Sequence, residues 1–115
     1  MATEIKLCYV TCPAIMTEIL IEDVWSIRFE CDTAASHSIM SDKVYRSLRH
    51  QKPKRIPALK QEKLVIRLAD GSISSKACGS VRLHVKARNS REVKLDFFVM
   101  DGPNNLLGRY ALEQL

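Results

Sequence analysis

An acidic residue followed by small side chains is the first feature of this sequence that could do chemistry. Asp32 ends an alternating apolar run and is followed by Thr33, Ala34 and Ala35. A carboxylate at the end of a strand, with no bulky neighbour to shield it, can be presented to a cleft, and small residues beside it let a substrate backbone come close. Taken alone the signal is weak, because an aspartate at a strand end is most often a turn or capping residue.

A second informative segment lies near the C-terminus. An apolar run ends at the turn residues Gly102 and Pro103, and the chain continues as Leu106-Leu107-Gly108-Arg109. By itself this pattern predicts an ordinary strand, turn and short helix, in which Gly108 permits close packing.

Other reactive residue types form no convincing site. Cys8 and Cys12 with His37 or His50 have no second closely spaced pair of ligands, so the sequence does not favour a metal site. Nothing in the sequence indicates that Ser38 and His84 belong to a catalytic triad with a nucleophilic serine. The four cysteines lack the spacing of a disulfide framework and are interpreted as free thiols.

The elements that must position these residues are mostly strands, since apolar and polar residues alternate with a period of two. The alternation predicts five strands, with apolar positions in Ile15–Ile21, in Trp25, Ile27, Phe29 and Cys31, in Leu64, Ile66 and Leu68, in Val81, Leu83 and Val85, and in Val93, Leu95, Phe97 and Val99.

Turn and helix signals complete the pattern. Asp70-Gly71 between two strand-like runs predicts a tight hairpin, because glycine tolerates the positive φ that such turns need. Glu22-Asp23 and Asn89-Ser90 predict further turns. Ser41 can cap a helix from Asp42 to about His50, and a second short helix is expected after Gly108. The sequence therefore predicts an all-β fold with two short helices.

Composition sets broader limits. A chain of 115 residues predicts one domain, 1–115. It has no apolar run near the ~20 residues of a membrane helix and no secretory signal, so we expect a cytoplasmic protein without membrane contact. Residues 43–63 hold eight basic residues and one acidic residue, a local charge of +7. This segment allows a weak contact with nucleic acid, although a solvated helix face is the simpler interpretation.

Three segments, in the same order and spacing, resemble the retropepsins, the aspartic proteases of retroviruses and of Ty3/gypsy-type LTR retrotransposons. Asp32-Thr33-Ala34-Ala35 resembles their Asp-Thr/Ser-Gly-Ala/Ser motif, and Ile39-Met40-Ser41 resembles the residues that follow it. Leu106-Leu107-Gly108-Arg109 resembles their segment before the C-terminal helix. Ala69-Asp70-Gly71-Ser72 falls where the family places its flap hairpin, and the resemblance covers residues 14–115.

The resemblance implies a retropepsin-like closed acid-protease barrel whose active site forms only in a homodimer. Asp32 from each chain would activate a water molecule for attack on an extended polypeptide, with no metal and no cofactor. In this family the protease processes a Gag-Pol polyprotein, which implies a location within virus-like particles as part of that polyprotein.

The resemblance also implies a role for each neighbouring residue. Thr33 would join the two active-site loops across the dimer axis, while Ala34 and Ala35 would line the floor below the substrate. Gly108 would allow close packing, and Arg109 would brace the loop by a charged hydrogen bond. The residues that would close over the substrate are Ala69, Asp70, Gly71, Ser72 and Ile73.

Two positions depart from the family pattern and leave alternatives open. Ala34 replaces the usual glycine, which allows a non-catalytic retropepsin-like domain used for dimerisation or peptide binding. Ser36 stands where retroviral members often carry an acid that pairs with the arginine corresponding to Arg109. A basic β-domain that binds nucleic acid through residues 43–63 is a third hypothesis.

Overall fold

In the part of the chain that the structure describes, the five alternating segments all form strands, and three shorter strands and two short helices complete the fold. The computed structural model describes residues 3–6, 15–67, 73–102 and 105–115. In chain order the elements are β1 (Thr3–Lys6), β2 (Ile15–Ile21), β3 (Trp25–Cys31), β4 (Ser38–Ser41), α1 (Asp42–Gln51), β5 (Lys60–Arg67), β6 (Ile73–Ala87), β7 (Val93–Met100), β8 (Leu106–Leu107) and α2 (Arg109–Gln114).

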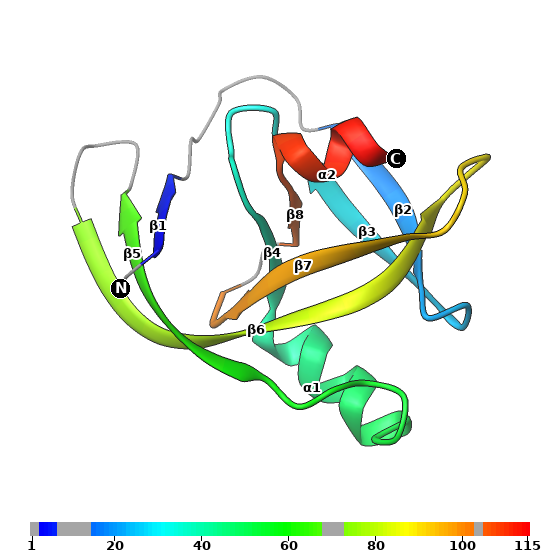
Figure 1. Cartoon of the computed structure of the whole chain (residues 1–115), viewed down its shortest axis with the longest axis horizontal. Helices are drawn as coiled ribbons and strands as arrows, with labels where there is room; N and C mark the ends of the chain where they lie inside the picture. The colour runs from blue at the N-terminus through cyan, green and yellow to red at the C-terminus, as the bar shows by residue number, and fades with distance from the viewer. Residues whose placement is uncertain (1–2, 7–14, 68–72, 103–104) are drawn as a thin grey trace.

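The long strand β6 closes the sheet into a barrel. The strand order is β1-β5-β6-β2-β3-β8-β4-β7, and β6 also pairs with β7. Strands β6, β2, β3, β8, β4 and β7 therefore form a ring, as Figure 1 shows. Closure of this kind removes the open edges that a flat sheet would expose. The expected closed β-barrel with two helices is thus confirmed.

The barrel interior is filled by the residues that the alternation placed inward. Val81, Leu83 and Val85 are buried, and the intervening residues of β6 point outward. Phe29 of β3 and Phe97 of β7 are both fully buried, with ring centroids 5.5 Å apart. These contacts join strands from the two halves of the sequence, so the core forms only when both halves are in place.

Helix α1 confirms the expected helix after Ser41. Tyr45 and Leu48 are buried, and the Tyr45 hydroxyl donates to the carbonyl oxygen of Pro57 at 2.7 Å. Ser41 stands at the N-cap position but makes no side-chain capping bond. The second expected helix is α2, which begins just after Gly108. Neither helix is long and apolar enough to span a membrane, and the described residues contain no other helix.

Strands β5 and the first half of β6 form a hairpin that extends away from the barrel (Figure 1). The pairing runs from Lys60 opposite Ser80 to Arg67 opposite Ile73. The predicted turn residues 69–72 lie outside the described residues. Strand β1 pairs with β5 in parallel, so the N-terminal strand lies on this hairpin within the same chain.

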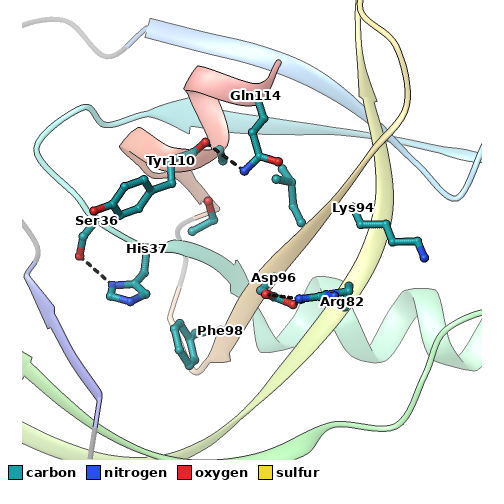
Figure 2. A pocket seen from close by; sticks show the side chains of 11 residues that line it. Ser36, His37, Arg82, Lys94, Asp96, Phe98, Tyr110 and Gln114 are labelled. Atoms are coloured by element: carbon teal, nitrogen blue, oxygen red, sulfur yellow. Dashed lines mark hydrogen bonds and ion pairs between the residues drawn. The ribbon is translucent and has the colours of Figure 1, made fainter.

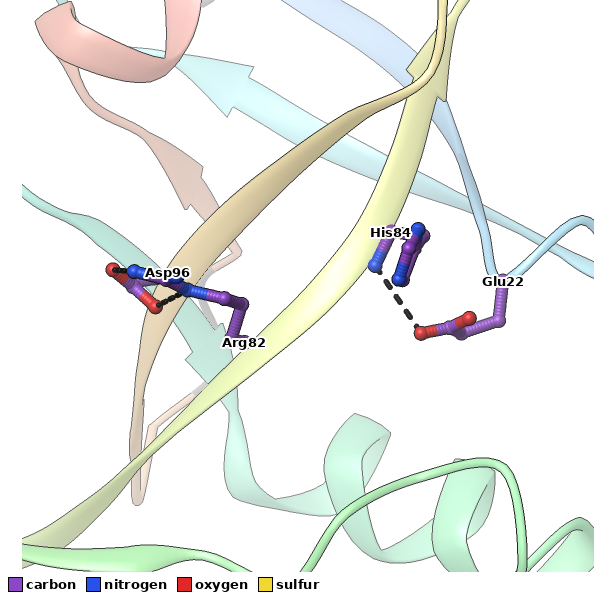
Figure 3. A network of polar contacts seen from close by, with 4 residues as sticks. All are labelled: Glu22, Arg82, His84 and Asp96. Atoms are coloured by element: carbon purple, nitrogen blue, oxygen red, sulfur yellow. Dashed lines mark hydrogen bonds and ion pairs between the residues drawn. The ribbon is translucent and has the colours of Figure 1, made fainter.

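The acidic turn between β2 and β3 was also predicted correctly. Glu22 and Asp23 have φ values of 52° and 59°, a conformation that costs free energy in residues other than glycine. Glu22 offsets this cost by two contacts with His84 of β6: its amide donates to the His84 carbonyl oxygen at 2.8 Å, and its carboxylate accepts from the His84 amide at 3.2 Å (Figure 3).

Candidate active site

Asp32 lies immediately after β3, and backbone hydrogen bonds hold it in place. Its amide donates to the carbonyl oxygen of Leu107 at 3.0 Å, and its carbonyl oxygen accepts from the amide of Ala35 at 3.2 Å. The carboxylate oxygen Oδ1 accepts from the amide of Ala34 at 3.1 Å. Within the described part of the chain, Oδ2 has no hydrogen-bond partner. The half-buried Asp32 therefore shapes its own turn and keeps one carboxylate oxygen available.

The three small residues after Asp32 lie in two different environments. Thr33 and Ala34 are exposed, whereas Ala35 is fully buried. The first two therefore lie where a loop could face a substrate or a second chain. Ala35 does not line an open floor as expected; it supports the loop from within.

The short strand β8 lies directly behind this loop. It runs parallel to β3, with Cys31 opposite Leu107, and antiparallel to β4, with Ile39 opposite Leu106. The segment from Asp32 to His37 therefore connects two strands that have a third strand inserted between them. Such an insertion fixes both ends of the loop through strands that are distant in the sequence.

Gly108 and Arg109 brace the loop through their backbone. The amide of Arg109 donates to the carbonyl oxygen of Ala35 at 2.7 Å, and the amide of Gly108 donates to the Ser38 hydroxyl at 3.0 Å. A Cβ atom at Gly108 would lie 2.7 Å from the carbonyl oxygen of His37. Gly108 has φ −80°, so glycine is required here for space and not for its conformational freedom.

The expected charged hydrogen bond from the Arg109 side chain is not formed within the described part of the chain. The exposed guanidinium lies over the ring of Tyr110, 5.3 Å from its centroid. The bracing role of Arg109 is therefore carried by its amide, which any residue except proline could supply.

Two polar residues that sequence reasoning did not select support the site. Ser38 is 6% exposed, and its hydroxyl satisfies the Gly108 amide. Asn105 accepts from the Glu30 amide through its backbone oxygen and from the Ser41 amide through its side chain, both at 2.8 Å. Asparagine near a Gly-Pro turn could have suggested a structural role, but its partners could not be identified from the sequence.

The hairpin residues assigned to substrate closure are only partly described. Ala69, Asp70, Gly71 and Ser72 lie outside the described residues, and Ile73 opens β6 opposite Arg67. The strands that would carry a closing hairpin are thus present, and the contact of their tip with a substrate remains a prediction.

A cavity of about 450 Å³ borders the loop on the side of α2 and β7 (Figure 2). Ser36 and His37 line it, with the Ser36 hydroxyl 2.7 Å from His37 Nδ1. The His37 ring meets Phe98 edge-on at a centroid distance of 5.3 Å. Burial lowers the pKa of His37, so the neutral ring is favoured here.

One ion pair joins the neighbouring strands β6 and β7 beside the cavity. Arg82 of β6 and Asp96 of β7 form a two-point ion pair at 2.9 and 3.1 Å (Figure 3). The hydrogen bond from Arg82 lowers the pKa of Asp96.

The thiol of Cys31 lies at the end of β3, just before Asp32. Its pKa is raised mainly by burial and, to a smaller extent, by the negative charge of Glu30. Cys31 is a free thiol, as expected.

The described residues contain no cluster of histidine, cysteine, aspartate or glutamate that could hold a metal ion. Cys8 and Cys12 lie outside them, so the rejection of a zinc site at these cysteines stays a prediction.

Comparison with known proteins identifies the fold. No protein-family model and no curated protein matches the chain. Among solved structures, the chain is similar to EIAV protease complexed with the inhibitor HBY-793, with a TM-score of 0.70 and 25% sequence identity. The match covers 91% of this chain and 90% of that chain. The chain therefore has the retropepsin-like fold of the retroviral aspartic proteases.

Proposed function

We propose that the chain is an aspartic endopeptidase that acts as a homodimer, with one Asp32 from each copy. The observation that carries the proposal is the placement of Asp32 on a retropepsin-like fold. Asp32 follows β3 in a tight turn, keeps one carboxylate oxygen available and is followed by the exposed Thr33 and Ala34.

The mechanism follows from two carboxylates held close together. Two like charges at short distance cannot both ionise, so one carboxyl group keeps a proton and the pair titrates as a unit. The ionised carboxylate takes a proton from a bound water molecule, and that water attacks the scissile carbonyl carbon. The protonated partner donates its proton to the carbonyl oxygen, which stabilises the tetrahedral intermediate.

The substrate we propose is an extended polypeptide, and more specifically a retroelement Gag-Pol polyprotein. An extended peptide can pair with a strand or a hairpin through its main chain. The β5–β6 hairpin supplies such strands, and its tip at residues 69–73 would close over the peptide and exclude water. Thr33 would bond to its counterpart across the dimer axis. We further propose that the protein acts in the cytoplasm, within particles assembled from the polyprotein.

Replacement of Asp32 by Asn is the direct test. Asn preserves the shape and the turn-forming oxygen but cannot take up a proton, so cleavage should fall by about 10²–10⁴-fold or more. The measurement is incubation of the purified protein with its flanking polyprotein at mildly acidic pH, with and without an aspartic-protease inhibitor. Asp23→Asn is the matched control, because Asn tolerates the positive φ of this exposed turn position.

Dimerisation is tested by dilution. Activity per chain should fall as the protein is diluted, in parallel with dimer dissociation measured by analytical ultracentrifugation. An active protein that stays monomeric at every concentration would contradict the proposal. A dimer that binds the polyprotein but leaves it uncut would support the non-catalytic alternative that Ala34 suggested.

A further inference from the structure

The solvent-exposed side of α1 is basic because the helical period separates it from the buried side. Tyr45 and Leu48 are buried, and at 3.6 residues per turn Lys43 and Arg46 lie on the opposite side of the helix. Both are exposed. Arg46 is paired with Asp42 at 2.9 Å, whereas Lys43 has no ion pair with the residues that the structure describes.

The loop after α1 continues this basic side and is held in a fixed conformation. The carbonyl oxygen of Lys52 accepts from the amides of Arg55 and Ile56 at 3.0 and 3.1 Å. Arg49 donates from Nη1 to the carbonyl oxygen of Ile56 at 2.9 Å, and the Ile56 side chain is fully buried. Lys52, Lys54 and Arg55 are exposed. Their backbone is thus already ordered, which reduces the entropy lost on binding a partner.

Five exposed cations form what we call the α1 basic surface: Lys43, Lys52, Lys54, Arg55 and Lys60. None of them has an ion pair within the described part of the chain, although Lys60 lies close enough to Asp96 for its charge to help lower the pKa of that carboxyl group. Large exposed apolar side chains lie elsewhere in the described residues, at Ile15, Met16, Val24 and Tyr110. The surface is therefore strongly basic and has no apolar anchor of its own.

The chemistry of this surface selects one class of partner. Protein interfaces depend on a few buried aromatic or apolar anchors, and amphipathic membrane-surface helices insert an apolar face into the lipid. The α1 basic surface offers neither a large apolar anchor nor an apolar face. Binding to regularly spaced phosphates requires only lysine and arginine side chains, and the release of counterions from the phosphates supplies the binding free energy. We propose that the α1 basic surface binds the phosphate backbone of nucleic acid without reading its sequence.

The location of the surface is compatible with the proposed peptidase activity but does not depend on it. Helix α1 follows the end of β4 that lies away from the Asp32 loop (Figure 1). The four residues of β4 correspond to about 13 Å of extended chain. A nucleic acid on α1 would therefore leave the loop accessible.

Binding of a fluorescein-labelled single-stranded RNA of about 20 nucleotides, followed by fluorescence anisotropy, tests the proposal. Each phosphate contact contributes about 0.7 to the slope of log affinity against log salt for single strands. Five contacts predict an affinity about 100-fold lower at about 200 mM than at about 50 mM salt. Combined replacement of Lys52, Lys54 and Arg55 by Ala should reduce this ratio to about 7-fold.

The matched control removes three other exposed cations, Lys86, Arg88 and Arg91, by the same change to Ala. This control variant lowers the net charge by the same amount, and its RNA affinity should still differ about 100-fold between the two salt concentrations. An equal loss in both triple variants would overturn the proposal, since only net charge would matter. So would a lack of RNA binding at about 50 mM salt, or a preference for phosphatidylserine vesicles over RNA.

Two further variants keep the outcome interpretable. Lys43 lies in the first turn of α1 and takes no part in the hydrogen bonds that hold the loop. Lys43→Glu alone should therefore weaken RNA binding even if the triple variant is unstable. Asp32→Asn should bind RNA like the wild type, so that a failure of the peptidase proposal is distinguished from a failure of this one.

Discussion

Replacement of Gly108 by Ala should distort the loop that carries Asp32. Gly108 packs against the backbone of His37, where an added Cβ atom would lie 2.7 Å from the carbonyl oxygen, 2.8 Å from the carbonyl carbon and 2.9 Å from the nitrogen. Ordinary contacts of a Cβ atom begin at 3.4 Å. The backbone of His37 or of Gly108 must therefore move, since no side-chain rotation can relieve the contact.

The free-energy cost of this backbone movement depends on the two hydrogen bonds that join the segments around Gly108 and His37. The Gly108 amide donates to Ser38, and the Arg109 amide donates to Ala35, so a shift of either segment stretches both bonds. Overpacking of a well-packed site costs about 1–3 kcal/mol. For a chain of this size that loss corresponds to a melting temperature lower by about 4–12 °C.

Thermal unfolding at a fixed protein concentration measures the loss, because dimerisation makes stability depend on concentration. Gly79→Ala is the comparison, since its Cβ atom would lie 2.5 Å from the side chain of Leu59 and not against the candidate site. Both variants should melt earlier, but only Gly108→Ala should also lower peptidase activity per folded chain. A Gly108→Ala variant that melts within about 1 °C of the wild type would refute the packing argument.

Two further predictions concern the residues around the loop. Ser38→Ala removes the acceptor of the buried Gly108 amide and should lower the free energy of unfolding by about 1–3 kcal/mol in urea titrations, whereas Ser47→Ala on the exposed side of α1 should have little effect. Burial lowers the pKa of His37, so the unfolded chain binds the proton more readily and stability should fall as pH drops below about 6.5. His37→Gln should flatten this pH dependence in melts; an unchanged profile would show that His37 does not cause it.

Local patterns in the sequence were sufficient for five of the eight described strands and for both described helices. Val81, Leu83 and Val85 alternate with charged residues, and β6 buries them as the period of two predicts. Tyr45 and Leu48 recur at helical spacing and are buried in α1. In each case the information lies within a few neighbouring residues, and burial of one face decides the structure.

The support of the site could not be predicted in the same way. The hydroxyl of Ser38 bonds to the amide of Gly108, 70 positions away, and nothing local marks this serine as different from Ser36 or Ser41. Arg109 was selected for its charge, yet the contact it makes with the loop uses its amide. Backbone donors carry no signature in the residue type, so such contacts become visible only once the topology is known.

The insertion of β8 between β3 and β4 makes the position of Asp32 a property of the whole barrel. The acid comes from the first third of the sequence, but its amide is held by Leu107 and its turn by Arg109, both near the C-terminus. These bonds require β8 to lie between β3 and β4, where the strand order of the sheet places it. A fragment that contains Asp32 and its small neighbours but lacks residues 93–115 would therefore keep the motif and lose the geometry, which explains why the motif alone is a weak signal of function.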